Sequence, residues 1–205
     1  MDNKIINKYV RKIKKHTKQY GFKIRLIKKR KVENCAGLFK EEEKEILVAT
    51  KVSDKNWFLS LIHEYCHFLQ WRQDSKMWKA HERTWENTDP DTIDKWISKK
   101  IELSNYKRDK LFKAMIDVEY ECEKMVVKLI DDWNLPIDKK EYIQQANTYL
   151  NYYRVMKYLR FWYLAKKPPY EMENIYKKMP TKFNTKIHIK TLLKIFKPWI
   201  DGYKK

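Results

Sequence analysis

The sequence predicts an α+β fold in which one helix precedes a small three-stranded antiparallel sheet and a mainly helical C-terminal half. Apolar residues recur every three to four positions over residues 3–19, which is typical of an amphipathic helix. Apolar and charged residues then alternate in short runs between residues 22 and 50, as in half-buried strands. Long helical patterns fill most of the remaining chain.

The first helix is expected over residues 3–19, where Gly21 follows as a terminator. Three strands are expected over residues 22–27, 32–39 and 45–50, with a charged connection at residues 40–44. A helix over residues 55–71 contains no Gly or Pro and is apolar almost all round, so it should be buried, with Asp54 as its N-cap.

Residues 72–105 are polar and rich in tryptophan, which predicts a loop with a short helix. A helix over residues 106–133 should end before Pro136, and Asp138 should cap a tyrosine-rich helix that runs to about Leu164. Residues 1–135 are predicted to form the core, and residues 136–205 a helical extension packed on it in a single compact unit.

The net charge of +19 is concentrated at the two ends of the chain. Residues 1–30 hold twelve Lys or Arg against one acidic residue, and residues 176–205 hold nine against one, so these segments contribute +11 and +8. Such basic termini can bind nucleic acid or another polyanion. The alternative is that abundant lysine reflects the composition of an AT-rich genome.

Composition also argues against membrane insertion and secretion. No apolar run reaches 18 residues, and the first residues lack the apolar core of a signal peptide. Cys35, Cys66 and Cys122 show no metal-type spacing and are expected to be packing residues in a reducing compartment. The sequence therefore predicts a cytoplasmic protein, in the host cell cytoplasm if it is encoded by a virus.

His63 and His67 lie four positions apart in the predicted buried helix, with Glu64 beside the first. One helical turn places both imidazoles on the same face, where each can give a nitrogen to Zn²⁺. Glu64 can then act as general base on a water that the metal acidifies. The alternative is a core helix whose histidines only form hydrogen bonds with neighbours.

A catalytic zinc site needs a third protein ligand. Gln73 occupies the position of the third histidine in metzincins and excludes that class, which leaves His81, His188 or a carboxylate. Helical projection of residues 111–133 places Glu119 and Glu123 at the flank of the apolar face and Glu121 near the charged side. A core-facing carboxylate needs a cation, which is either a metal or a Lys or Arg at a helix crossing.

His63-Glu64-Tyr65-Cys66-His67 followed by Glu119-Tyr120-Glu121-Cys122-Glu123 resembles the two motifs of gluzincin metallopeptidases. The chain is similar to ImmA/IrrE-type peptidases and to small metallopeptidases encoded by tailed bacteriophages. This resemblance implies a zincin-like fold, Glu119 as the third zinc ligand and Glu123 as its outer-shell supporter. Glu123 is longer than the Asp or Asn common at that position.

The resemblance also implies hydrolysis of a protein or peptide substrate that is held by an edge strand. Residues 36–38, Ala36-Gly37-Leu38, are the expected substrate-binding edge, since a strand glycine often marks close backbone approach. The alternative for Gly37 is a bulge or bend. The alternative for the whole protein is a basic nucleic-acid- or protein-binding module with a structural or vestigial zinc site.

Overall fold

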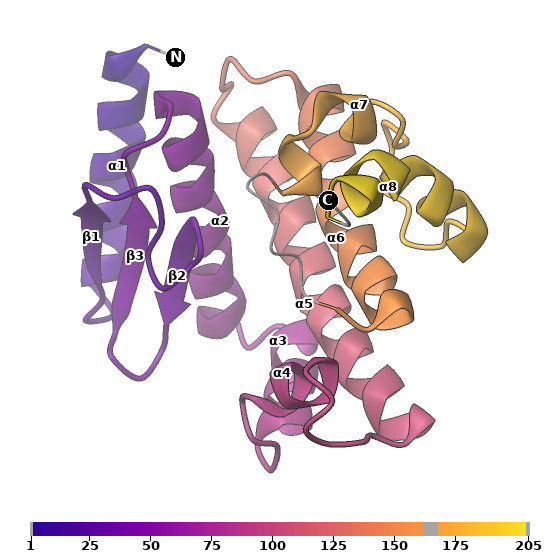
Figure 1. The fold of residues 1–205 in the computed structure, drawn as a ribbon. Helices are drawn as coiled ribbons and strands as arrows, with labels where there is room; N and C mark the ends of the chain where they lie inside the picture. The colour runs from indigo at the N-terminus through magenta and orange to yellow at the C-terminus, as the bar shows by residue number, and fades with distance from the viewer. Residues whose placement is uncertain (1, 162–167, 204–205) are drawn as a thin grey trace. The chain divides into compact units, whose positions relative to one another are not determined.

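The computed structural model describes residues 2–161 and 168–203 and has an α+β architecture (Figure 1). The elements up to the long central helix are α1 (Asn3–Lys18), β1 (Lys23–Ile27), β2 (Gly37–Lys40), β3 (Glu45–Ala49), α2 (Asp54–Arg72), α3 (Lys76–Trp85), α4 (Thr92–Ile97) and α5 (Asn105–Asp132). They are followed by α6 (Lys139–Leu159), the 3₁₀ turn η1 (Pro169–Glu171), α7 (Glu173–Tyr176) and α8 (Ile189–Tyr203).

The described chain divides into two compact units. Unit 1 contains residues 1–75 and 122–136, and unit 2 contains residues 76–121 and 137–205. The predicted division at residue 135 falls near the end of unit 1, but residues 76–121 cluster with the C-terminal helices. Helix α5 runs through the boundary, with Cys122 as the first of its residues in unit 1.

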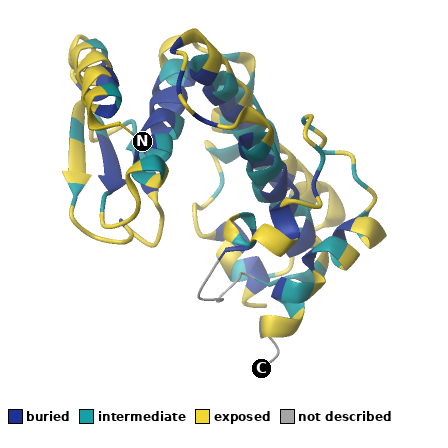
Figure 2. Ribbon diagram, turned by 90° about the horizontal axis from the view of Figure 1, so that it is seen from above, coloured by how far each residue is buried: buried dark blue, intermediate teal, exposed yellow. Residues whose placement is uncertain are grey.

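The sheet of unit 1 is mixed, so the prediction of a purely antiparallel sheet is wrong. The strand order is β1-β3-β2, with β1 parallel to β3 and β2 antiparallel to it. Central β3 is largely buried, whereas β1 is mostly exposed (Figure 2). The strands β2 and β3 form a hairpin, and β1 pairs with the other edge of β3. The connection from β1 to β2 therefore crosses from one side of β3 to the other.

The second strand is shorter than the predicted 32–39. Glu33 and Asn34 adopt left-handed backbone conformations with φ of 48° and 70°. Val32 and Cys35 exchange two backbone hydrogen bonds of 2.8 Å across them. Two left-handed residues between paired neighbours form a tight hairpin turn over residues 32–35. Strand β2 therefore begins only at Gly37.

Helix α2 begins at Asp54, one residue earlier than predicted, and its N-cap is Ser53 instead of Asp54. The Ser53 hydroxyl accepts a hydrogen bond from the Asn56 N–H at 3.3 Å, and Ser53 has the extended backbone of a cap residue. Asp54 already belongs to the first helical turn, where its carboxylate accepts from the Trp57 indole at 3.1 Å.

Helices α1 and α2 pack against the sheet and bury its inner face. Ile46 and Val48 of β3 are completely buried, as are Phe58 and Phe68 of α2. Tyr65 of α2 holds the two helices together, because its hydroxyl lies 2.6 Å from Nδ1 of His16 in α1. Burial raises the pKa of the Tyr65 hydroxyl to about 12, so it stays protonated at neutral pH.

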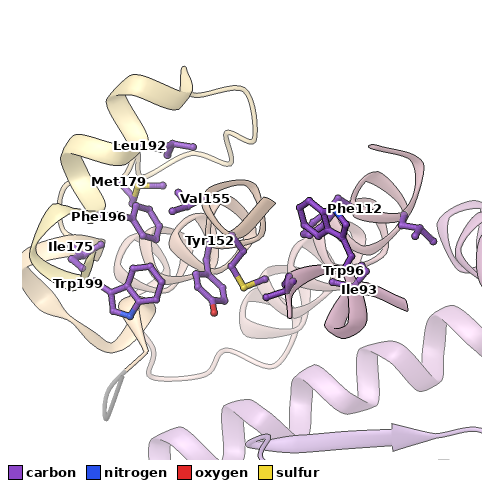
Figure 3. Close-up of a cluster of buried hydrophobic side chains, with 13 residues drawn as sticks. Ile93, Trp96, Phe112, Tyr152, Val155, Ile175, Met179, Leu192, Phe196 and Trp199 are labelled. Carbon is purple, nitrogen blue, oxygen red and sulfur yellow. The ribbon is translucent and has the colours of Figure 1, made fainter. Parts of the chain in front are cut away.

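Unit 2 is helical and has its own hydrophobic core. Side chains from α4, α5, α6, α7 and α8 meet there, and Val155, Leu192 and Phe196 are completely buried (Figure 3). Residues 72–105 form two short helices, α3 and α4, where the sequence predicted one. None of the described helices is long and apolar enough to cross a membrane.

Helix α6 is capped by Asp138 as predicted, since its carboxylate accepts from the N–H groups of Lys140 and Glu141. The helix ends at Leu159, because Arg160 takes a left-handed conformation with φ of 53°. The predicted end at Leu164 lies outside the described residues.

Candidate metal centre

His63 and His67 of α2 face one another through the same ring nitrogen. Their Nε2 atoms lie 3.1 Å apart and the two rings are nearly perpendicular, with an interplanar angle of 83°. Two nitrogens bound to one tetrahedral zinc at about 2.05 Å would lie about 3.3 Å apart. The spacing of the two Nε2 atoms therefore fits a single ion.

The opposite nitrogen of each ring, Nδ1, contacts an oxygen that can hold the ring in place. Nδ1 of His67 is hydrogen-bonded to Oε1 of Gln70 at 2.9 Å, and Nδ1 of His63 lies 3.3 Å from Oε1 of Glu123. Both partners are buried, with Gln70 0% and Glu123 5% exposed. An acceptor at Nδ1 places the proton there and leaves the Nε2 lone pair available to a metal.

Glu123 therefore reaches His63 despite its extra methylene group relative to Asp. Sequence reasoning missed Gln70. The available signal was its position three residues after His67 in a helix that is otherwise almost entirely apolar around the motif. An amide at such a position needs a hydrogen-bond partner, and the histidine one turn earlier provides it.

Cys122 joins the two histidines in the only group of potential metal ligands found among the described residues of the chain. Its sulfur and ring nitrogens of His63 and His67 lie within 4.8 Å of one another. The sequence predicts that Cys122 is a packing residue, and the residue is buried. The structure adds that the thiol contacts the imidazole of His63, so packing does not describe its full environment.

The sulfur of Cys122 contacts the Nδ1 side of His63. It lies 3.7 Å from Nδ1 and 3.4 Å from the backbone oxygen of the same residue. Glu123 contacts the same Nδ1 atom, whereas the facing pair is formed by the two Nε2 atoms. The thiol therefore lies beside the ring nitrogen of His63 that does not face His67.

Glu64 packs directly over Gly37 of strand β2. The glutamate is 7% exposed, and a methyl group added at Gly37 would lie 2.7 Å from its Cγ and 2.9 Å from its Oε1. Gly37 pairs regularly with Val48, so no bulge occurs there. The glycine thus provides the space that the Glu64 side chain occupies.

Residues 36–38 lie at an edge of the sheet, since β2 pairs with β3 and ends the strand order. Gly37 and Leu38 belong to β2, and the backbone oxygen of Ala36 accepts a hydrogen bond from Ala49 at 2.9 Å. The Glu64 side chain and this edge are therefore neighbours within unit 1. An extended peptide added to the edge would lie beside that carboxylate.

Glu119 belongs to unit 2, where it lines a cavity of about 440 Å³ together with His81 and Tyr153. The hydroxyls of Tyr149 and Tyr153 lie 2.7 Å apart. Burial, and next the charge of Glu119, raise the pKa of both tyrosines well above the usual value. The hydroxyls of Tyr149 and Tyr153 therefore remain protonated and can donate hydrogen bonds. No observation tests the assignment of Glu119 as a zinc ligand, which stays a prediction.

The other two histidines considered from the sequence have their own surroundings in unit 2. The ring of His81 packs near Trp78 and Trp85, with centroids 6.3 and 6.0 Å away. Nδ1 of His188 accepts a hydrogen bond of 3.3 Å from the backbone N–H of Lys190 at the start of α8.

Comparison with models of protein families, with curated proteins and with solved structures found no match to this chain.

Replacing Gln70 with Ala should weaken zinc binding about 10- to 100-fold, because His67 loses the acceptor that fixes its tautomer and ring orientation. Competition with a chromogenic chelator measures the affinity. Gln73→Ala is the matched control, since Gln73 is exposed at the C-cap of the same helix. Gln70→Glu keeps an acceptor and should retain most of the affinity; equal affinities for all three variants would contradict the role of Gln70.

Proposed function

We propose that this protein is a zinc-dependent metallopeptidase. The observation that carries the proposal is the facing pair of Nε2 atoms on His63 and His67, 3.1 Å apart, in a helix whose buried Glu64 packs over an edge strand. Imidazole nitrogens are suitable ligands for zinc, and the oxygen acceptors at both Nδ1 atoms favour the tautomer that carries its lone pair on Nε2.

Zinc, when bound, lowers the pKa of a water to about 7 and polarises a carbonyl oxygen. The chain would supply the remaining functions. Glu64 would accept the proton of the attacking water and pass it to the leaving amine. Residues 36–38 would hold the substrate as an added strand, beside the carboxylate that moves the proton.

Two residues are candidates for the third ligand. Glu119 follows from the motif resemblance, and Cys122 follows from its distance to the histidines. We favour Glu119, since the Cys122 sulfur contacts the Nδ1 side of His63, away from the Nε2 pair. Cys122 and Glu123 would then contact the Nδ1 side of the His63 ring and hold the ring in its orientation.

Glu119→Gln should weaken zinc binding more than 100-fold, whereas Glu121→Gln and Cys122→Ser should each change it less than tenfold. Glu121→Gln is the matched control, because it makes the same change two residues away on α5. Cobalt-substituted protein gives a second measurement, since a thiolate ligand would add an intense near-ultraviolet charge-transfer band. Such a band, lost in Cys122→Ser, would assign the third position to Cys122.

The direct test of the function is hydrolysis of a library of internally quenched peptides by protein reconstituted with zinc. Chelator-treated protein and Glu64→Gln are the controls. Activity should depend on zinc and on Glu64. Stoichiometric zinc without hydrolysis of any peptide or denatured protein would instead support a structural site.

A further inference from the structure

Helix α1 carries a straight stripe of positive charge on its outer face. At 100° per residue, Lys4, Lys8, Arg11, Lys15 and Lys18 fall within about 80° of one another. All five are exposed, and Lys12 and Lys14 flank them. At 1.5 Å per residue the stripe extends for about 21 Å.

The opposite face of α1 holds the helix in unit 1. Ile6, Tyr9, Val10, Ile13 and Thr17 are buried and lie on the side away from the stripe. Helix α1 is therefore already folded and packed in unit 1, and its basic face is exposed on a preformed surface. No coupled folding is needed before this face can meet a partner.

No acidic side chain neutralises the stripe within the part of the chain that the structure describes. The sequence contains no Asp or Glu between Asp2 and Glu33, whereas thirteen Lys or Arg lie in that interval. The described salt bridges include none from the seven basic residues of α1. Uncompensated like charges at this density repel one another unless an anionic partner binds.

We infer that the Lys4–Lys18 stripe binds the phosphate backbone of a nucleic acid without regard to base sequence. The two strands of B-DNA together carry one negative charge per about 1.7 Å of the duplex axis, so a stripe of about 21 Å can meet phosphates along its whole length. Lysine and arginine make many of their contacts to DNA with phosphate oxygens, and phosphate contacts carry no direct sequence information. The expected partner is therefore a polymer with regularly spaced negative charges, as in a phosphate backbone.

An anionic membrane fits this surface less well. A helix that lies in a membrane interface needs large apolar side chains beside its basic face. The large apolar side chains of α1 are buried against unit 1. The stripe therefore provides positive charge, but α1 has no exposed apolar face that could insert into a membrane.

The test measures the binding of the full-length protein to a fluorescein-labelled 20-bp duplex by anisotropy over a range of NaCl concentrations. Five phosphate contacts predict a slope of log affinity against log salt of about −4.5, a loss of about 500-fold for a fourfold rise in salt. The variant Lys4→Gln/Arg11→Gln/Lys15→Gln should reduce the slope to about −2 and the affinity at low salt at least tenfold. A second duplex of unrelated sequence should bind equally well.

The matched control removes three charges elsewhere. Lys51, Lys76 and Lys110 are exposed and lie outside α1, so Lys51→Gln/Lys76→Gln/Lys110→Gln makes the same change in net charge. It should leave the slope near −4.5, and Lys4→Arg/Lys15→Arg should do the same because it keeps the charge. Chelator should have no effect on either value, which separates this inference from the fate of the zinc site.

Three results would overturn the inference. The first is an equal loss of duplex affinity and salt slope in the stripe variant and the control variant. The second is no binding of wild-type protein to the duplex at low salt. The third is tighter binding to phosphatidylserine vesicles than to the duplex. The first would assign any binding to net charge alone, and the third would assign the stripe to a membrane surface.

Discussion

His67→Ala should reduce bound zinc from about one ion per chain to background after reconstitution and gel filtration. The variant removes one of the two Nε2 atoms that lie 3.1 Å apart and leaves His63 to hold the ion with fewer donors. A lost ligand should cost more than the 10- to 100-fold typical of a lost supporting contact. His63→Ala should behave in the same way, and metal analysis of the purified variants measures both.

His81→Ala is the control for these two variants, because it removes another partly buried histidine, within unit 2. It should keep full zinc content. Loss of zinc in His81→Ala would make that histidine a ligand and contradict the assignment of the third position. Wild-type protein that binds no stoichiometric zinc after reconstitution would refute the metal centre altogether.

Zinc should also stabilise the wild-type fold but not the His67→Ala variant. Free zinc at 1,000 times its Kd adds about 4 kcal/mol to the free energy of unfolding. For a chain of 205 residues that corresponds to a rise in Tm of roughly 8 to 16 °C. Thermal unfolding with and without chelator therefore gives a readout that does not depend on catalysis.

The helices of this protein could be predicted from sequence because their causes are local. The apolar period of α1, the absence of Gly and Pro in α2 and the Asp138 cap of α6 all act within a few residues. Strand pairing is different, since it depends on which strand lies beside which. The chain turns at Glu33 and Asn34 between β1 and β2, and β1 pairs in parallel with β3. The alternation of apolar and charged residues carries no information on that pairing.

The candidate site shows the same limit. Two histidines one turn apart and a carboxylate beside them could be found in the sequence because one helix positions them. Helical phase predicts that Glu123 flanks the apolar face of its helix, and the structure places its carboxylate 3.3 Å from Nδ1 of His63. The environment of Cys122 could not be predicted, because a cysteine on an apolar helix face has the same pattern whether it contacts leucine or imidazole.

Glu64→Gln should abolish peptide hydrolysis, with a loss of at least 100-fold in kcat, while bound zinc stays near one per chain. The amide has almost the same shape as the carboxylate and keeps the packing over Gly37, but it cannot accept the proton of the attacking water. Gly37→Ala makes the complementary change: its methyl group would come within 2.7 Å of Cγ of Glu64, so the carboxylate must move while its chemistry is retained. We expect that variant to lose activity in kcat and to keep zinc. Zinc loss in Glu64→Gln would make Glu64 a ligand or structural partner, and full activity in that variant would exclude it as the general base.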